Sequence, residues 1–231
     1  MSPPLRHSAV GKIVAEFLGT AVLALAIVGS GAHAHSLSSD DGVVLLINAT
    51  VTAAVLAALI ATLLPLSGAH FNPAVTLVML MRKEIASGQA AGFVTAQVAG
   101  AIGGTIVAHW LFTASAPVIG DLERINPSTF VAEIIATAGL LFIIVTAVIR
   151  GAVHQLPGWV ALWIGAGYFV TPSTGFANPA ITIGRIFTDT FTGIEPASAA
   201  WFIAAQIGGA LVGFGIAIGL HRHLRQLAIK G

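Results

Sequence analysis

Six apolar runs, separated by short polar stretches, dominate the pattern of the chain. A helix needs about 20 apolar residues to cross the hydrocarbon core of a bilayer, and most of the runs approach or exceed that length. The runs cover residues 12–29, 43–64, 89–112, 130–149, 157–171 and 197–220, and the fifth is the shortest. We therefore predict an all-α integral membrane protein with six transmembrane helices.

Two further apolar segments are too short to cross a bilayer, and each begins with the same tripeptide. Asparagine is a favourable N-cap, and proline suits the first helical turn, where no backbone donor is needed. Each segment is roughly 10 residues long, which as a helix is about 15 Å, or half of a bilayer. We predict half-helices from Asn72 to about Met81 and from Asn178 to about Phe187. The tripeptides are Asn72-Pro73-Ala74 and Asn178-Pro179-Ala180.

The two halves of the chain repeat each other. Residues 15–20 match residues 132–137, and residues 96–100 match residues 205–209. Each half holds three spans and one half-helix, and an odd number of spans gives the halves opposite topology. We predict one channel domain, residues 1–231, made of inverted repeats at about 9–112 and 127–220. In such folds the functional site lies near the midplane, where the repeats meet.

Composition and charge agree with a membrane location. Hydrophobic residues make up 56% of the chain and charged residues only 8%. Of the 10 Lys and Arg residues, only Arg124 and Arg185 fall on the side opposite to the termini. The positive-inside rule then predicts cytoplasmic termini and a multi-pass protein of the cytoplasmic (inner or plasma) membrane. The chain has no cysteine, which excludes disulfides and thiolate metal sites. We expect no metal, no cofactor and no nucleic-acid partner.

The predicted half-helices should meet N-terminus to N-terminus near the midplane. Their positive dipole ends would repel cations, and the two asparagine amides would donate hydrogen bonds to a passing oxygen. Water in single file would have to reorient at these donors, which opposes proton transfer. These features predict a passive channel for neutral, hydrogen-bonding solutes that excludes protons and ions.

The motifs resemble those of the major intrinsic protein family, the aquaporins and aquaglyceroporins. The resemblance rests on the two Asn-Pro-Ala tripeptides, on residues 67–70 before the first, and on the repeated Glu- and Gln-containing motifs. It implies a homotetramer with one pore per subunit, passing water, glycerol or other small uncharged solutes. It also implies that Asn72 and Asn178 are pore donors and that Glu16 and Glu133 support the loops preceding the half-helices.

Some roles stay open at the level of sequence. Glu16 and Glu133 are either loop supports or members of a proton relay, and a relay would make the protein a proton-coupled secondary transporter. His70 is either a pH-sensitive gate or a residue that braces the loop and lines the pore. An intramembrane enzyme is disfavoured, because the midplane offers no matched set of nucleophile and base.

The resemblance also locates a selectivity filter that departs from the family pattern. Most members carry arginine three residues after the second asparagine, where this chain has Ile181. Family spacing places the other filter positions at Thr52, Ala166 and Gly175, a small and mostly apolar set. We expect a wide opening that passes glycerol, urea or neutral metalloid hydroxides such as arsenite, as in bacterial members without the arginine. Arg185, one helical turn beyond Ile181, lies either in the outer vestibule or at the headgroups.

Overall fold

The computed structural model describes residues 8–113 and 115–230, and these residues form helices joined by loops. Residues 1–7, 114 and 231 of the predicted domain lie outside the described residues. The six long helices are α1 (Ala9–Leu37), α2 (Asp41–Ser67), α4 (Ser87–Thr113), α5 (Pro127–Ile149), α6 (Leu156–Val170) and α8 (Pro196–Lys230). The short elements are α3 (Pro73–Met81), η1 (Val153–Gln155), α7 (Pro179–Gly184) and η2 (Arg185–Phe187). The predicted all-α fold of six long helices and two half-helices is confirmed.

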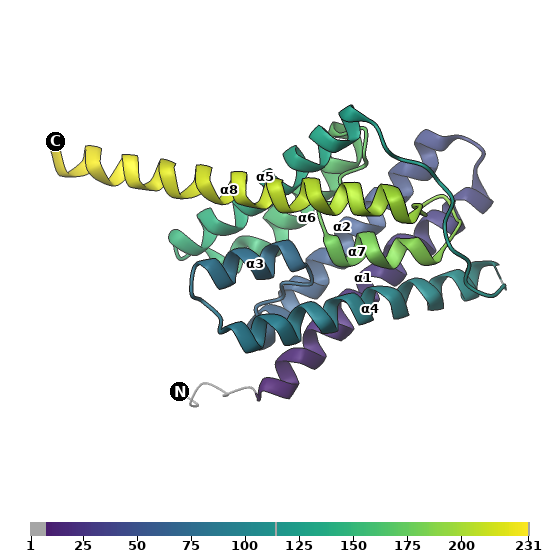
Figure 1. The fold of residues 1–231 in the computed structure, drawn as a ribbon, viewed down its shortest axis with the longest axis horizontal. Coiled ribbons are helices and arrows are strands. Elements are labelled where there is room, and N and C mark those ends of the chain that lie inside the picture. The colour runs from purple at the N-terminus through teal and green to yellow at the C-terminus, as the bar shows by residue number, and fades with distance from the viewer. Residues whose placement is uncertain (1–7, 114, 231) are drawn as a thin grey trace.

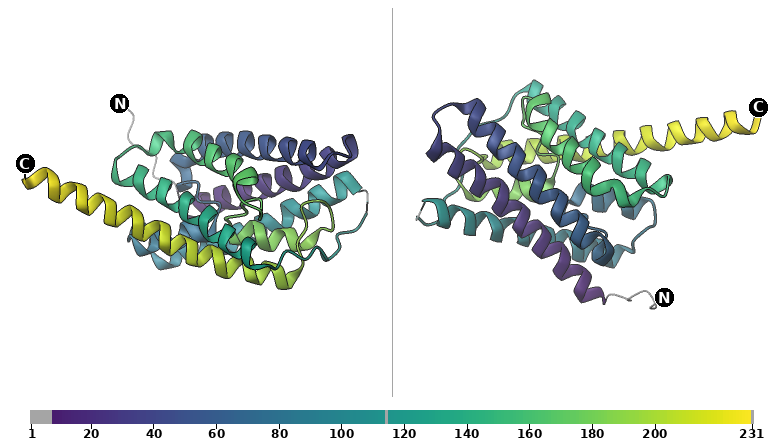
Figure 2. Two further views of the ribbon diagram at one scale, coloured as in Figure 1. Left: turned by 90° about the horizontal axis from the view of Figure 1, so that it is seen from above. Right: turned by 180° about the vertical axis from the view of Figure 1, so that it is seen from behind.

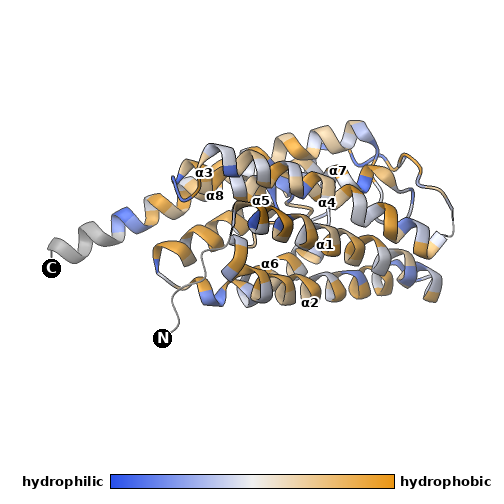
Figure 3. Ribbon diagram, turned by 90° about the horizontal axis from the view of Figure 1, so that it is seen from below, coloured by the Kyte–Doolittle hydropathy of each residue, from blue (hydrophilic) through white to orange (hydrophobic). Residues whose placement is uncertain are grey.

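Each predicted apolar run lies within one long helix, except that the fifth run extends one residue past the end of α6, to Thr171. Within the described residues, five helices are long and apolar enough to cross a membrane by length and composition. The sixth, α6, has 15 residues and occupies the place of the shortest predicted run. Hydrophobic residues cover the helices along most of their length, and hydrophilic residues gather toward the ends of the bundle (Figure 3). This is the surface that a bilayer requires.

In Figure 1 the half-helices α3 and α7 lie between α8 and α4, and both contact these two long helices. The start of α1 and the end of α8 point to the same end of the bundle in every view, as an even number of crossings demands (Figures 1 and 2). The C-terminal part of α8 extends beyond the other helices (Figure 2). The half-helix α3 ends at Met81, as predicted. In the second repeat α7 ends at Gly184, and a 3-10 turn, η2, completes the segment to Phe187.

Helix pairs related by the repeat cross at glycines, where the backbones touch. A Cβ atom on Gly104 of α4 would overlap the carbonyl oxygen of Ala21 in α1. Gly213 of α8 stands in the same relation to Ala138 in α5. Such small residues let membrane helices approach closely enough for van der Waals packing to hold them together. The two crossings fix the frame within which the half-helices lie.

The crossing predicts different outcomes for two adjacent glycines of α4. Gly104→Val should destabilise the protein by about 1–3 kcal/mol, because the new side chain must separate α1 from α4. Gly103→Val is the matched control, because a Cβ there meets nothing within 4 Å. Thermal unfolding of the detergent-solubilised protein measures both changes. Equal unfolding temperatures for the two variants would contradict the backbone contact.

Candidate functional site

Two strained loops lead into the half-helices. Gly68, the C-cap of α2, has φ 96°, and Ala69 and Phe71 have φ 49° and 48°. In the second repeat Thr174, Gly175 and Ala177 have φ 61°, 59° and 47°. A residue other than glycine in this region costs about 1–3 kcal/mol, so the surrounding structure must hold it there.

The carboxylate of Glu16 holds the first loop. The buried side chain accepts hydrogen bonds from the backbone N–H groups of His70 (3.0 Å) and Phe71 (2.7 Å) and from Ser67 Oγ (2.6 Å). Its second oxygen also accepts from Gln97 Nε2 (2.7 Å) in α4. Four donors thus converge on one carboxylate, and they satisfy backbone groups that the irregular loop leaves without helical partners.

Glu133 repeats this arrangement in the second half. It accepts from Ser173 Oγ (2.6 Å), from the N–H groups of Phe176 and Ala177 (both 2.9 Å) and from Gln206 Nε2 (2.7 Å). Each glutamine extends the network to its own half-helix. Gln97 donates to Thr76 Oγ1 and Gln206 to Thr182 Oγ1, both at 2.9 Å. Each carboxylate therefore ties a loop, a long helix and a half-helix together.

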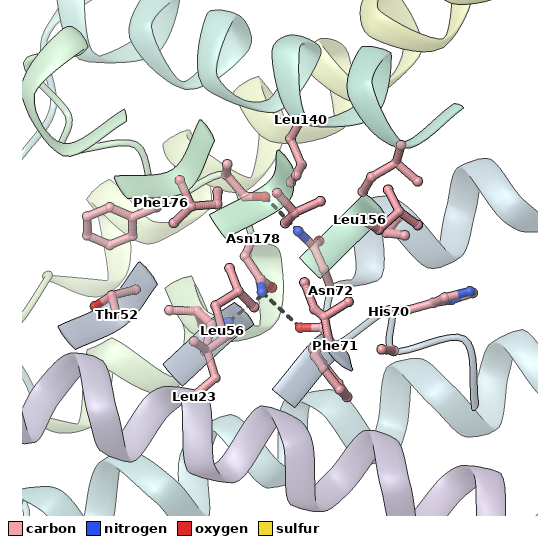
Figure 4. Close-up of a pocket in the computed structure, with 18 of the residues that line it drawn as sticks. Leu23, Thr52, Leu56, His70, Phe71, Asn72, Leu140, Leu156, Phe176 and Asn178 are labelled. Atoms are coloured by element: carbon pink, nitrogen blue, oxygen red, sulfur yellow. Dashed lines mark hydrogen bonds between the residues drawn. The ribbon is translucent and has the colours of Figure 1, made fainter. Parts of the chain in front are cut away.

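The two asparagines join the repeats at the centre. Asn72 Nδ2 donates to the carbonyl oxygen of Ala177 (2.7 Å), and Asn178 Nδ2 donates to that of Phe71 (2.8 Å). Each Oδ1 caps its own half-helix, by accepting from the N–H of Ala74 (2.8 Å) or Ala180 (3.0 Å). The bonds cross between the two loops in Figure 4. Each amide keeps a second N–H, since only one of its two is used in the cross-link.

A cavity of about 290 Å³ passes this asparagine pair. Its walls are mostly apolar, and its lining residues extend from Glu84 and Val153, near the end of the bundle that holds the termini, to Phe176 and Arg185. Figure 4 shows Asn72 and Asn178 between Thr52 and Phe176 on one side and His70 on the other. Of the predicted site residues, the cavity is lined by Thr52, His70, Asn72, Gly175, Asn178, Ile181 and Arg185.

Of the four predicted filter positions, Ala166 is the one that does not line the cavity, contrary to the prediction. The residue lies on the outer surface of α6, in a shallow groove beside Phe142 and Trp163. The face of α6 that lines the cavity is instead Leu156, Val160, Ile164 and Tyr168, spaced four residues apart. A residue two positions before Tyr168 is turned by about 200° around the helix and must face away.

Tyr168 lines the cavity and was not among the predicted site residues. It is the single tyrosine of the chain, it is buried, and its hydroxyl lies 3.0 Å from Thr52 Oγ1 across the cavity wall. The signal that could have found it is the four-residue spacing of the α6 stripe. The cavity lining therefore includes a polar pair, Thr52 and Tyr168, together with the apolar residues Gly175 and Ile181.

Arg185 points into the bundle and is only 4% exposed. Its Nε donates to the carbonyl oxygen of Thr192, and its Cζ lies 3.4 Å from the centroid of the Phe176 ring. Within the described part of the chain, the guanidinium makes no other hydrogen bond. Its terminal N–H groups are therefore free to bind a solute. This burial places the side chain at the cavity and away from the headgroups.

His70 is held on the opposite side of the asparagines. Its Nδ1 lies 3.1 Å from Thr76 Oγ1, and its ring packs edge-on against Phe93 with centroids 5.4 Å apart. The ring points away from the asparagine pair in Figure 4, although the residue lines the cavity. These contacts brace the side chain against α3 and α4.

The model of a family described as major intrinsic protein matches residues 5–176. The chain belongs to the major intrinsic protein family. One relative is the aquaglyceroporin AqpS of Rhizobium meliloti, 42% identical over 94% of this chain and 91% of the relative. Another is the glycerol uptake facilitator protein-like 6 of Lactiplantibacillus plantarum, 29% identical over 88% of this chain and 95% of the relative.

A solved structure shares the fold. The X-ray structure of the aquaglyceroporin from Plasmodium falciparum superposes with a TM-score of 0.70, at 23% identity over 97% of this chain and 100% of that one. Aquaglyceroporins of the major intrinsic protein family are channels and not enzymes. The chain is therefore a multi-pass membrane channel for water and small solutes.

The convergence of donors on Glu16 predicts that Glu16→Gln destabilises this family member by about 3 kcal/mol. The new amide would face Gln97 Nε2 or a loop N–H, donor against donor. Glu123→Gln is the matched control, because Glu123 is exposed in the loop between α4 and α5. Chemical unfolding followed by tryptophan fluorescence measures the difference. If both variants unfold like the wild type, Glu16 does not support the loop.

Proposed function

We propose that the protein is a passive channel for water and small uncharged solutes, and that it excludes protons and ions. One observation carries the proposal: a single cavity passes two asparagine amides, each of which keeps a free donor. A neutral solute can replace the hydrogen bonds it makes with water by bonds to these donors. A cation meets two helix N-termini, whose positive dipole ends disfavour its passage.

The solutes that suit this lining carry hydroxyl or amide groups on a compact apolar body. Polar side chains of the cavity lining include those of Asn72, Asn178, Thr52, Tyr168, His70 and Arg185, whereas much of the remaining wall is aliphatic. Glycerol, urea and neutral metalloid hydroxides such as arsenite fit this description. The names of the two relatives, an aquaglyceroporin and a glycerol uptake facilitator, favour glycerol-sized solutes over water alone.

We assign the selectivity filter to Thr52, Tyr168, Gly175, Ile181 and Arg185. Ile181 and Gly175 leave the opening wide and apolar where most family members have a positive charge. Arg185 supplies a donor one helical turn farther along. This combination selects by size less strictly than an arginine at position 181 would, and it keeps a positive charge at the mouth.

A proton-coupled transporter is the alternative, and the buried carboxylates argue against it. Glu16 and Glu133 are 0% exposed and do not belong to the cavity lining. Each already receives four hydrogen bonds, so its oxygens have no place for a proton that must come and go. We therefore assign both residues to loop support.

Membrane placement and assembly follow from charge and family. We propose the cytoplasmic membrane, with both termini cytoplasmic. The helices α3 and α5, whose C-caps are Arg82 and Arg150, end toward the end of the bundle where α1 begins (Figure 1). We also propose a homotetramer with one pore in each subunit, as the family resemblance implies.

Stopped-flow light scattering on proteoliposomes tests the function. Wild-type protein should raise water and glycerol permeability well above that of bare liposomes, without saturation and without dependence on pH. Ile181→Arg should reduce glycerol flux roughly tenfold or more and water flux less, because the side chain narrows and charges the opening. Ile181→Leu keeps the wall apolar and is the matched control, which should retain the glycerol flux. Saturable, pH-dependent glycerol flux would favour the transporter.

A further inference from the structure

The loop between α4 and α5 holds a second arginine, Arg124. Like Arg185, it contacts the loop after η2 and the ring of Phe176. Both polar groups of the Arg124 backbone are hydrogen-bonded. Its N–H donates to Ser198 Oγ (2.8 Å) at the start of α8, and its carbonyl oxygen accepts from Thr129 Oγ1 (2.7 Å) in α5. The residue is therefore anchored to two long helices. Burial lowers the pKa of Arg124 to about 10, which leaves the guanidinium protonated at neutral pH.

The side chain of Arg124 clamps the loop after η2. Its Nε donates to the carbonyl oxygen of Gly193 (3.0 Å) and its Nη2 to that of Phe191 (3.2 Å). The residue between them is Thr192, whose carbonyl oxygen accepts the hydrogen bond from Arg185 Nε. Three consecutive carbonyl groups thus accept from two arginines. Because Arg124 fixes the carbonyls on both sides, it also fixes the direction of the one that holds Arg185.

The two arginines share an aromatic ring as well. The Cζ atoms of Arg185 and Arg124 lie 3.4 Å and 5.5 Å from the centroid of Phe176, a residue of the cavity wall. Contact with an aromatic face favours a cation when it is withdrawn from water. The guanidinium groups of Arg124 and Arg185 repel each other. The ring and the carbonyl groups together offset this repulsion and keep the two groups close.

We propose that Arg124 is a positioning residue for the solute filter, and that it acts by orienting Arg185 through residues 191–193 and Phe176. The inference rests on the proposed function, in which Arg185 is the charged donor of the filter. In this chain the arginine missing at position 181 is replaced by a pair. One member, Arg185, faces the cavity, and the other, Arg124, holds it in place from outside the cavity lining.

The ratio of glycerol to water permeability in proteoliposomes tests the inference. Arg124→Met keeps an unbranched stem close in size to the aliphatic part of arginine and removes the donors and the charge. It should change the ratio as Arg185→Met does, roughly tenfold for the loss of one charge-assisted hydrogen bond. The double variant should show no further change, because the two residues act as one unit. Arg150→Met, at an exposed arginine toward the other end of the bundle, is the matched control and should keep the wild-type ratio.

The outcomes separate the inference from the function on which it rests. A changed ratio in Arg185→Met with a wild-type ratio in Arg124→Met overturns the positioning role alone. Changes that add in the double variant also overturn it, because they mean that Arg124 acts independently of Arg185. An unchanged ratio in Arg185→Met, with normal channel flux, removes Arg185 from the filter and overturns the inference with it.

A second measurement applies if Arg124→Met does not insert. Arg124→Lys keeps the positive charge but cannot reach two carbonyl groups with a planar fork of donors. Asp189→Cys provides the single thiol of a cysteine-free chain at an exposed position of the loop, where a nitroxide label reports motion. The label should be clearly more mobile in the Arg124→Lys background than in the otherwise wild-type chain. Equal mobility in the two backgrounds would overturn the clamp.

Discussion

The channel depends on the pair of hydrogen bonds by which each asparagine of one repeat binds a loop carbonyl of the other. Asn72 and Asn178 each cap a half-helix, join the two repeats and keep one donor in the cavity. No other short polar side chain provides an acceptor for the helix and two donors at once. The same atoms therefore set the geometry of the pore and its chemistry, so a substitution at either position affects both.

The cost of this arrangement falls on the loops before the half-helices, and two buried glutamates offset it. Left-handed residues such as Phe71 and Ala177 would not keep their conformation in an apolar medium without partners for their N–H groups. Glu16 and Glu133 provide those partners from the long helices α1 and α5. An acidic residue inside a membrane is usually a sign of transport chemistry, yet here the hydrogen bonds favour a structural role.

Much of the fold and the centre of the site could be predicted, because they follow from periodic or repeated patterns. Apolar length fixes the spans, and the duplicated tripeptide fixes the half-helices and the asparagine pair. The face of α6 that lines the cavity was predicted less well, because it depends on the rotation of the helix about its axis. Family spacing does not determine that rotation, so it placed Ala166 in the filter and left out Tyr168, which lines the cavity. The hydrogen bonds of Arg124 to the carbonyl oxygens of Phe191 and Gly193 join segments far apart in the sequence, so no local sequence pattern predicts them.

Proton flux through the reconstituted channel tests the central claim most directly. Liposomes loaded with a pH-sensitive dye, with the membrane potential clamped by potassium and valinomycin, report proton entry after a step in external pH. Wild-type protein should raise water permeability with no proton flux above that of bare liposomes. Asn72→Asp keeps the cap but replaces the donor with a negative charge, and it should leak protons. A proton-tight Asn72→Asp channel with normal water flux, or a leaking wild type, would contradict the account.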